Sequence, residues 1–361
     1  MRIMQIVPSF EVGGAETVCA ELCLELQKMG HSVVAVSLSP AQSKLTRALT
    51  EGGVDLRLLG KNLGLDLNCV LRLRALIREV RPQVIHTHLH ALKYAALAQF
   101  GFRPIPILHT VHNQAQEEAV KLDQHIARYL FHRGKALPVA LSQEIRTSIA
   151  ALYGIPEERI PIVANGIDLH RCLQKTDYAL HYPPRLLHVG RFYPQKNHEI
   201  MLEALKLLKF RGIAPKLICY GDGPRLKEMQ ALTKEMGLEN QVEFPGLCDN
   251  VYPKLAHGDV FLMPSKWEGV PMAVIEAMAT GLPVVAARVG GLPNLVADGV
   301  DGILIEPTPE NLAQAIEDLL KDETRRQKLG QAACRSAQRF GSEAMAKEYE
   351  ALYTARRGGR R

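Results

Sequence analysis

The sequence lacks the features that mark several protein classes. It contains a single tryptophan, so no aromatic platform is available for stacking single-stranded nucleic acid. Its seven cysteines are odd in number and include no Cys-x-x-Cys pair, which disfavours a disulfide framework or a zinc site and favours reduced thiols in a cytoplasmic protein. No apolar run approaches the ~20 residues that span a bilayer. The opening segment 2–7 is too short for the apolar core of a signal peptide, and we expect a strand there.

Charge and composition describe an ordinary globular chain. Forty-four basic and 38 acidic residues give a net charge of +6, which fits an anionic small ligand or an anionic membrane surface better than nucleic acid. The 47% hydrophobic and 23% charged residues exclude collagen, a long coiled coil and wholesale disorder. At roughly 100–200 residues per domain, the length predicts two domains.

Short apolar runs alternate with amphipathic stretches along most of the chain. We expect strands at about 2–7, 32–38, 54–59, 83–87, 106–111, 137–141, 160–163, 185–190, 215–220, 241–244, 259–263, 283–287 and 302–305. We expect helices at about 15–29, 66–80, 90–100, 120–132, 142–152, 198–211, 309–320, 323–339 and 342–355, with further helices between the later strands. This alternation predicts the α/β class, with parallel strands joined by crossover helices.

The pattern pauses at about 166–184, where two prolines are adjacent, and we interpret this stretch as the domain junction. We expect Rossmann-like domains over 1–180 and 181–340, followed over 341–361 by a helix that packs back toward the first domain and a basic tail. The four arginines of that tail indicate a solvated end or weak attraction to anionic lipid. Two such domains would face each other across a deep interdomain cleft, the default ligand site of open α/β sheets.

Two loops have the composition of a phosphate site. Gly13 and Gly14 follow the first strand and precede a helix, so backbone N–H groups there can approach a phosphate. Arg191 and Lys196 lie five residues apart between a strand and a helix, and their charges suit a diphosphate. Each loop also has a simpler interpretation, a tight packing turn for the first and solvated surface charges for the second.

The segment 264–279 is the most informative part of the sequence. Pro271 suits the first position of a helix, whose N-terminal N–H groups favour an anion. Glu268 precedes that helix and Glu276 lies on it, eight residues later. Because carboxylates accept hydrogen bonds from sugar hydroxyls, two of them beside an anion site fit a nucleotide sugar. The alternative for Glu276 is a half-buried acid on the helix face.

The sequence resembles family 4 of the retaining glycosyltransferases, which have the GT-B fold. Glu268-x7-Glu276 matches the paired-glutamate motif of that family in its setting Ser-x-x-Glu-Gly-x-Pro, and Arg191 and Lys196 fit its diphosphate-binding pair. Further matches follow in order along nearly the whole chain: Gly13-Gly14-Ala15-Glu16, Asn165-Gly166-Ile167-Asp168, Gly221-Asp222-Gly223-Pro224 and Gly290-Gly291-Leu292-Pro293.

The resemblance implies a nucleoside diphosphate sugar donor, expected to be a UDP-sugar, with no cofactor and no metal ion. Glu276 would hold the ribose hydroxyls and Glu268 would contact the donor hexose. Arg191 and Lys196 would neutralise the leaving diphosphate. The rest of the implied donor site is backbone near the base and the phosphates: Gly13, Gly14, Leu247, Cys248, Gly269, Val270, Pro271 and Met272.

The resemblance also implies an active-site histidine in the first domain, which fits His112. His109 is a rival, but residues 109 and 112 face opposite sides of a strand, and His112 is nearer its carboxyl end. His86, His88 and His90 alternate on another strand end, where zinc ligation is the alternative to polar residues lining the cleft.

The implied reaction moves a hexose to a hydroxyl acceptor held by the first domain, with retention of configuration. We expect attack on the face that the diphosphate leaves, with the departing phosphate as the base, because no acid of the first domain has a claim to act as a nucleophile. The products would be cell-surface polysaccharide or glycolipid. The arginines of the helix at about 66–80 leave open an ordinary solvated face or a peripheral site at the inner face of the cell membrane, where the acceptor would be a lipid-linked sugar.

Three other functions stay open at this point. A nicotinamide-dependent oxidoreductase is disfavoured because Glu16 and Thr17 occupy the place of the third glycine of the dinucleotide fingerprint. A non-catalytic subunit that binds sugar nucleotides, or an epimerase of GT-B fold, would use the same donor residues.

Overall fold

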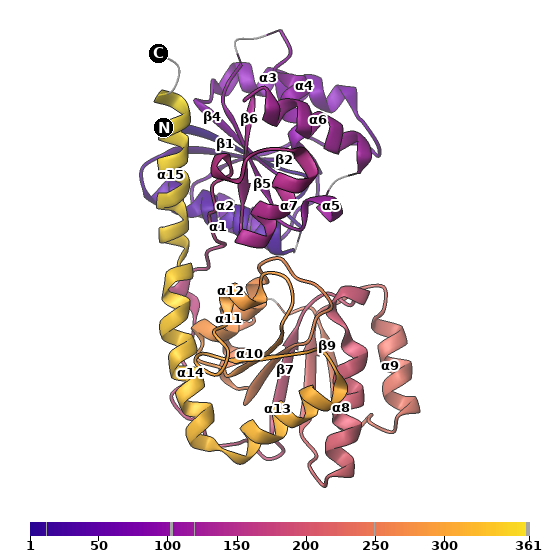
Figure 1. Ribbon diagram of the computed structural model, residues 1–361. Helices are drawn as coiled ribbons and strands as arrows, with labels where there is room; N and C mark the ends of the chain where they lie inside the picture. Colours follow the sequence, from indigo (N-terminus) through magenta and orange to yellow (C-terminus); the bar gives the residue numbers. More distant parts are fainter. Residues whose placement is uncertain (12, 102–103, 119, 249, 359–361) are drawn as a thin grey trace. The chain divides into compact units, whose positions relative to one another are not determined.

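The computed structural model describes residues 1–11, 13–101, 104–118, 120–248 and 250–358 (Figure 1). The chain forms two compact units. Unit 1 combines Met1–Ile167 with Phe340–Arg361, and unit 2 is Asp168–Arg339. The last two arginines of the basic tail, and with them part of the lipid-attraction hypothesis, lie outside the described residues.

Unit 1 contains one six-stranded parallel sheet with helices on both faces (Figure 1). Its strands are β1 (Arg2–Val7), β2 (Ser32–Ser37), β3 (Asp55–Leu58), β4 (Val84–His88), β5 (Ile107–Val111) and β6 (Ala136–Ala140). Its α-helices are α1 (Gly14–Lys28), α2 (Lys44–Glu51), α3 (Leu67–Val80), α4 (Leu92–Ala98), α5 (Ala115–Glu118), α6 (Lys121–His132), α7 (Gln143–Tyr153) and, from the end of the chain, α15 (Ser342–Gly358). Unit 1 also contains the short 3-10 helices η1 (Leu89–Ala91) and η2 (Glu157–Arg159).

Unit 2 repeats this architecture with a second six-stranded parallel sheet. Its strands are β7 (Arg185–Val189), β8 (Lys216–Tyr220), β9 (Val242–Gly246), β10 (Val260–Met263), β11 (Val284–Ala287) and β12 (Ile303–Ile305). Its α-helices are α8 (His198–Phe210), α9 (Leu226–Glu235), α10 (Tyr252–Ala256), α11 (Met272–Ala279), α12 (Leu292–Leu295), α13 (Pro309–Lys321) and α14 (Glu323–Ala337). Short 3-10 turns cover η3 (Leu169–Arg171) and η4 (Pro194–Lys196), and η5 (Gln338–Phe340) leads back to unit 1.

The two sheets have the same strand order. It reads β3-β2-β1-β4-β5-β6 in unit 1 and β12-β11-β10-β7-β8-β9 in unit 2, so in each sheet the order in which strands are added reverses next to the first strand of that unit. Ligands of doubly wound sheets bind beyond the carboxyl ends of the strands at this switch point. The switch points are therefore between β1 and β4 and between β7 and β10.

Burial explains why the strands could be read from the sequence. Every residue of β4, β5, β10 and β11 is buried, as expected for central strands covered on both faces. The core of unit 2 includes the inner face of α8, which packs against α13. In unit 1 the C-terminal helix α15 packs against α1 and buries Tyr349 and Tyr353. The predicted α/β class with parallel strands is confirmed in both units.

Three local predictions were wrong. No strand forms over 160–163, where Ile162 makes only an isolated bridge with Ala140, because Pro161 has no N–H to extend a ladder. Helix α2 was missed, although its N-cap Ser43 and Thr46 bond each other reciprocally in a capping box. Pro271 is not the first helical residue: its extended ψ of 118° makes it the N-cap, and α11 begins at Met272.

Candidate functional site

Two loops meet at the switch point of unit 2. One follows β7 and contains Arg191 and Lys196, and the other follows β10 and contains Glu268. The N–H of Lys266 donates to the carbonyl of Gln195 at 2.8 Å, and the Asn197 side-chain amide donates to the carbonyl of Pro264 at 3.2 Å. These hydrogen bonds hold the two loops together, as the adjacency of β7 and β10 requires.

The carboxylate of Glu268 is the centre of this arrangement. It is only 5% exposed, and its Oε1 lies 2.6 Å from Lys196 Nζ. The hydroxyl of Ser265 donates to the same oxygen at 2.6 Å, and the Gln195 side chain donates to Oε2 at 3.3 Å. Burying a carboxylate is tolerated only when it is paired and hydrogen-bonded, and Glu268 meets both conditions. The structure thus joins the predicted hexose contact directly to one of the predicted diphosphate cations.

Arg191 has a different environment from Lys196. It is exposed, its guanidinium lies 4.8 Å from the centre of the Tyr193 ring, and it donates to the Tyr193 hydroxyl at 3.3 Å. The two cations are on one loop, but the structure places only Lys196 in contact with Glu268.

Gly290 and Gly291 pack closely against the backbone of the Glu268 loop. A Cβ atom on Gly290 would lie 2.0 Å from the carbonyl oxygen of Glu268, and one on Gly291 would lie 2.0 Å from that of Gly269. The Gly291 N–H donates to the Glu268 carbonyl at 3.1 Å. The two backbone segments can approach this closely only because side chains are absent.

The other predicted donor residues border the same end of the sheet. Met272 begins α11, and Glu276 lies on that helix, half-buried. Burial first, and then the negative charge of Glu276, raise the pKa of the Cys172 thiol to about 12. Leu247, which is exposed, and Cys248 follow β9, and the Cys248 thiol lies 3.2 Å from the Asn250 carbonyl oxygen.

In unit 1 the glycine loop forms the beginning of α1. Gly13 is the N-cap, and Gly14 is the first helical residue. Both the N–H and the hydroxyl of Thr17 donate to the Gly13 carbonyl, at 3.0 and 2.8 Å. A Cβ atom on Gly13 would lie 2.3 Å from the Glu16 carboxylate. An added Cβ would therefore meet only the end of the flexible Glu16 side chain, which could move aside.

His112 directly follows β5, and a chain of buried hydrogen bonds fixes its tautomer. Gln5 donates its amide N–H to the Tyr353 hydroxyl at 3.0 Å, so its oxygen accepts from His88 Nε2–H, also at 3.0 Å. The remaining nitrogen of neutral His88, Nδ1, is then an acceptor. It lies 3.0 Å from His112 Nε2, which must donate, so His112 keeps a lone pair on Nδ1.

Burial keeps these rings neutral. It lowers the pKa of His112 to about 3 and holds the pKa of His88 and His86 well below the usual range. The Tyr353 hydroxyl contacts His86 Nδ1 at 2.7 Å, and His86 Nε2 contacts the Thr110 hydroxyl at 2.8 Å. Helix α15 therefore extends the chain of hydrogen bonds that ends at His112.

His109 lies on the opposite face of the sheet, as strand periodicity predicts, with its Nδ1 2.9 Å from the Thr87 hydroxyl. The alternative zinc site does not form from His86, His88 and His90, because the first two are bonded within the core while His90 is half exposed beyond β4. No group of three or more His, Cys, Asp or Glu side chains that could hold a metal ion occurs among the described residues.

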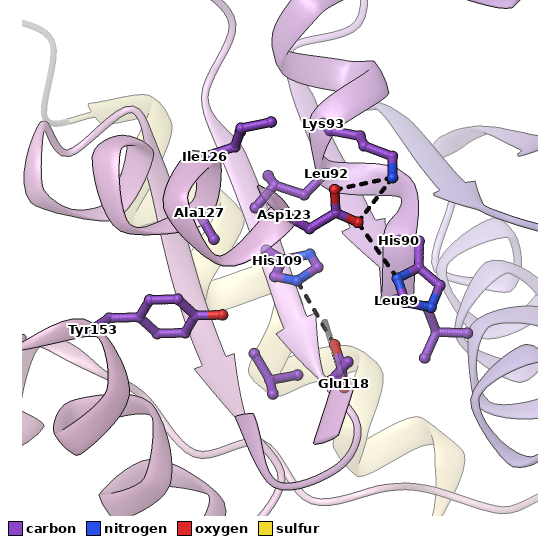
Figure 2. Close-up of a pocket in the computed structure, with 11 residues that line it drawn as sticks. Leu89, His90, Leu92, Lys93, His109, Glu118, Asp123, Ile126, Ala127 and Tyr153 are labelled. Carbon is purple, nitrogen blue, oxygen red and sulfur yellow. Dashed lines mark hydrogen bonds and ion pairs between the residues drawn. The ribbon is translucent and has the colours of Figure 1, made fainter. Parts of the chain in front are cut away.

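Sequence reasoning missed three polar residues of unit 1. Gln5 is buried in the middle of an apolar strand, and a single polar residue in such a strand could have indicated a buried hydrogen bond. Tyr353 gave none, because it is 348 residues from Gln5. Glu118 is buried beside a pocket that contains His109 (Figure 2), and its pKa is raised to about 7 by burial against the opposing effect of two backbone N–H bonds.

The basic helix predicted at about 66–80 corresponds to α3. Arg72 bonds Asp66 and the Gly60 carbonyl, and Arg74 bonds the Phe100 carbonyl. Within the described ranges, no helix combines the length and apolar character needed to cross a bilayer.

Comparisons with known proteins assign the family. The model of the glycosyl transferases group 1 matches residues 177–336, and that of Glycosyltransferase Family 4 matches residues 12–171. The D-inositol 3-phosphate glycosyltransferase of Corynebacterium aurimucosum is 30% identical over 309 residues, which are 76% of this chain and 72% of that protein. The N-acetyl-α-D-glucosaminyl L-malate synthase of Bacillus anthracis is 32% identical over 57% of this chain. The chain spans about half the length of several curated relatives, with matches covering 49%, 48% and 53% of them.

Structural similarity extends over the whole fold. The structure of Anabaena Alr3699/HepE in complex with UDP-glucose aligns with a TM-score of 0.84 at 22% identity, over 98% of this chain and all of that one. Sucrose-phosphate synthase of Thermosynechococcus elongatus aligns with a TM-score of 0.82 at 20% identity, covering 98% and 99% of the two chains. With two Rossmann-like sheets and a relative of this identity and coverage, the chain belongs to the glycosyl transferases group 1 and family 4, which have the GT-B fold.

Proposed function

We propose that this protein is a retaining glycosyltransferase that moves a hexose from a UDP-sugar to a hydroxyl acceptor. The observation that carries the proposal is the largely buried Lys196–Glu268 pair at the switch point of unit 2, held at 2.6 Å on two interlocked loops. An ammonium group and a carboxylate side by side offer one group for a phosphate and one for sugar hydroxyls. The UDP and UDP-glucose complexes of the Anabaena protein support a uridine nucleotide as the donor.

Each side chain of this site has a role in the proposed reaction. The bond between the anomeric carbon and the phosphate oxygen breaks, and its electron pair goes to that oxygen. Lys196, Arg191 and the N–H groups at the start of α11 stabilise the growing negative charge. Glu268 accepts from hexose hydroxyls and Glu276 from the ribose, while the backbone of Leu247 and Cys248 contacts the base.

The acceptor belongs to unit 1 in this proposal, beside His112 and the Gly13-Gly14 turn. The acceptor oxygen attacks the face that the phosphate leaves and passes its proton to the departing phosphate oxygen, so configuration is retained without an enzyme nucleophile. Detection of a covalent sugar adduct on Glu268 would contradict this route. Lys196 and Arg191 supply the positive charge, so we propose transfer without a metal ion and expect full activity in EDTA.

The pathway proposed is synthesis of cell-surface polysaccharide or glycolipid. An Escherichia coli relative, 28% identical over 69% of each chain, is named as a galactosyltransferase acting on α-D-GlcNAc-diphosphoundecaprenol. We extend to this chain a lipid-linked acceptor and peripheral binding to an anionic membrane. Sedimentation with liposomes tests the latter: equal recovery with neutral and anionic vesicles at low salt would contradict it.

The experiment that tests the donor is a thermal-shift screen of the full chain with UDP, GDP, ADP and NAD. A ligand at ~100 times its dissociation constant stabilises the folded state by about 2.7 kcal/mol. We expect UDP to stabilise the protein and Lys196→Met to abolish that shift. NMR of the product formed from a UDP-hexose then reports the anomeric configuration. Stabilisation by NAD with none by the nucleoside diphosphates would overturn the proposal.

A further inference from the structure

A pocket opens in unit 1 beyond the carboxyl ends of β4 and β5 (Figure 2). It is lined by residues of η1, α4, β5, α6 and α7 and by Glu118 of α5. Leucine, valine, isoleucine and alanine side chains form much of the wall, the Tyr153 hydroxyl points inward, and the other polar groups cluster at two places. One is at its base, where His109 and Glu118 face each other, and the other surrounds Asp123 (Figure 2).

Glu118 presents one unpartnered oxygen to this pocket. Its side chain is 5% exposed, and Oε2 accepts the backbone N–H groups of His112 and of Asn113, the latter at 2.9 Å. Oε1 is buried without a hydrogen-bond partner and lies 3.8 Å from His109 Nε2. A buried carboxylate oxygen without a donor is costly, so a donor is expected to reach it.

The hydrogen bonds of His109 determine which of its ring nitrogens carries the proton. The Thr87 hydroxyl donates to the Leu108 carbonyl at 3.2 Å, so it accepts from His109 Nδ1–H at 2.9 Å. Neutral His109 therefore carries a lone pair on Nε2. Two acceptors, His109 Nε2 and Glu118 Oε1, face each other across 3.8 Å. A hydroxyl group placed between them could donate to either acceptor.

The ammonium group of Lys93 in this pocket is already paired with a carboxylate. Lys93 Nζ lies 3.0 and 2.8 Å from the two carboxylate oxygens of Asp123, and His90 Nδ1 lies 3.7 Å from one of them. Among the eleven lining residues Lys93 carries the ammonium group that a phosphate would need, and the Asp123 carboxylate is paired with it. Hydroxyl donors match the base of the pocket, whereas an anionic group there would meet the Glu118 carboxylate.

We propose that this pocket is the acceptor subsite and that it receives the hydroxyl-bearing edge of a neutral sugar ring, with hydroxyls donating to Glu118 Oε1 and His109 Nε2. The apolar wall would cover the C–H face of the ring. Glu118 Oε2 accepts the backbone N–H of His112, so the same carboxylate would contact both the bound sugar and the His112 backbone. The inference rests on the proposed function and adds the class of acceptor: a neutral sugar in place of a sugar phosphate.

The test measures binding to the full chain at pH 8 without a nucleotide. The probes are methyl α-D-glucopyranoside, methyl α-D-galactopyranoside and methyl α-D-mannopyranoside, each compared with the corresponding hexose 6-phosphate by saturation-transfer NMR titration. We expect at least one glycoside to bind and no phosphate to bind more tightly than its glycoside. Tighter binding of the phosphates would overturn the proposal.

Two substitutions locate the binding. Glu118→Gln can keep its oxygen on the His112 and Asn113 N–H groups while its amide N–H meets His109 Nε2, so it should weaken glycoside binding at least tenfold. The matched control is Glu117→Gln, an exposed neighbour on the same helix, for which we expect no change. His109→Leu removes the second acceptor without touching the loop and should also weaken binding at least tenfold, which covers a failure of the first variant to fold.

The outcomes separate this inference from the proposed function. If UDP stabilises the chain but no glycoside binds, or if Glu118→Gln and His109→Leu both bind as the wild type does, the acceptor subsite is wrong and the donor assignment stands. If glycosides bind in a Glu118-dependent way but UDP does not bind, the sugar site stands and the transferase proposal fails. An Asp123→Asn variant provides a further measurement. It removes the charge paired with Lys93 and should therefore increase the affinity for the hexose 6-phosphates.

Discussion

His88 Nδ1 lies 3.0 Å from His112 Nε2, and this contact assigns the proton of the neutral His112 ring to Nε2. His88 is in turn oriented by Gln5, so a residue of the first strand determines which nitrogen of His112 is available as an acceptor. Because both rings are buried and neutral, the assignment does not depend on pH near neutrality.

The first prediction concerns this positioning role. His88→Leu removes the acceptor for His112 Nε2–H, so the His112 ring loses its fixed orientation, and kcat should fall by up to about 100-fold, as expected for a misplaced active-site group, with the KM of the donor unchanged. His88→Asn can offer its amide oxygen near the former Nδ1 and should recover most of the rate. Steady-state kinetics of both variants provide the measurement, and equal losses in the two would show that His88 acts only through packing.

The second prediction concerns the stability of unit 2. Lys196→Met leaves the Glu268 carboxylate buried at 5% exposure without its cation, and we expect a loss of about 3 kcal/mol in the free energy of unfolding. The double variant Lys196→Met with Glu268→Gln removes the charge as well and should regain more than half of that loss. Urea denaturation of the wild type, both single variants and the double variant measures the coupling. Additive effects would mean that the pair contributes nothing.

The third prediction uses two glycines of positive φ. Gly290→Ala places a Cβ atom 2.0 Å from the Glu268 carbonyl and should displace that loop, raising the KM for the donor at least tenfold. Gly299→Ala is the control, because Gly299 has a φ of +72° and no atom within 4 Å of the place that an added Cβ would take, so it carries the backbone strain alone. A similar KM for the two variants would refute the role of Gly290 in supporting Glu268.

The fourth prediction is a loss of stability on mild acidification. Burial lowers the pKa of His109 to about 4 and of His112 and His198 to about 3, and it lowers those of His86, His88 and His188 as well. Below the unfolded value near 6.5, the unfolded chain therefore binds more protons than the folded one, and stability falls as the pH falls toward 4. Glu118 has the opposite sign, because its pKa of about 7 makes the folded state less stable as the pH rises from 4.5 to 7.

Six histidines outweigh one glutamate, and each contributes up to about 1.4 kcal/mol per pH unit in this range. We expect the free energy of unfolding to drop by more than about 3 kcal/mol between pH 6.5 and pH 5. Urea midpoints at the two pH values measure this drop. Equal midpoints would mean that the buried rings are protonated without cost.

Most strand positions could be predicted because central parallel strands are rich in apolar residues, as in β10 and β11, although β4 and β5 also contain buried histidines and threonines. Helix α2 escaped notice because it is eight residues long and largely polar, although Leu45 and Leu49 lie one turn apart on its buried face and Ser43 and Thr46 form its cap. The segment 160–163 has the composition of a strand, but Pro161 cannot donate to a ladder.

The site was predictable as a set of residues and not as a set of contacts. Glu268 and Lys196 stood out by motif, yet their ion pair depends on β10 lying next to β7, which the chain order does not reveal. Gln5 and Tyr353 meet only because α15 returns to unit 1. Glu118 had no pattern of its own, and its importance comes from the burial of an oxygen that no donor reaches.

The return of α15 has a consequence for biosynthesis. Unit 2 is continuous in sequence and is available in full once residue 339 has left the ribosome. Unit 1 begins first but lacks Tyr349 and Tyr353 until helix α15 is made, so Thr110 and His86 have no tyrosine hydroxyl partners during most of translation. The half of the protein that is synthesised first is therefore the half that matures last.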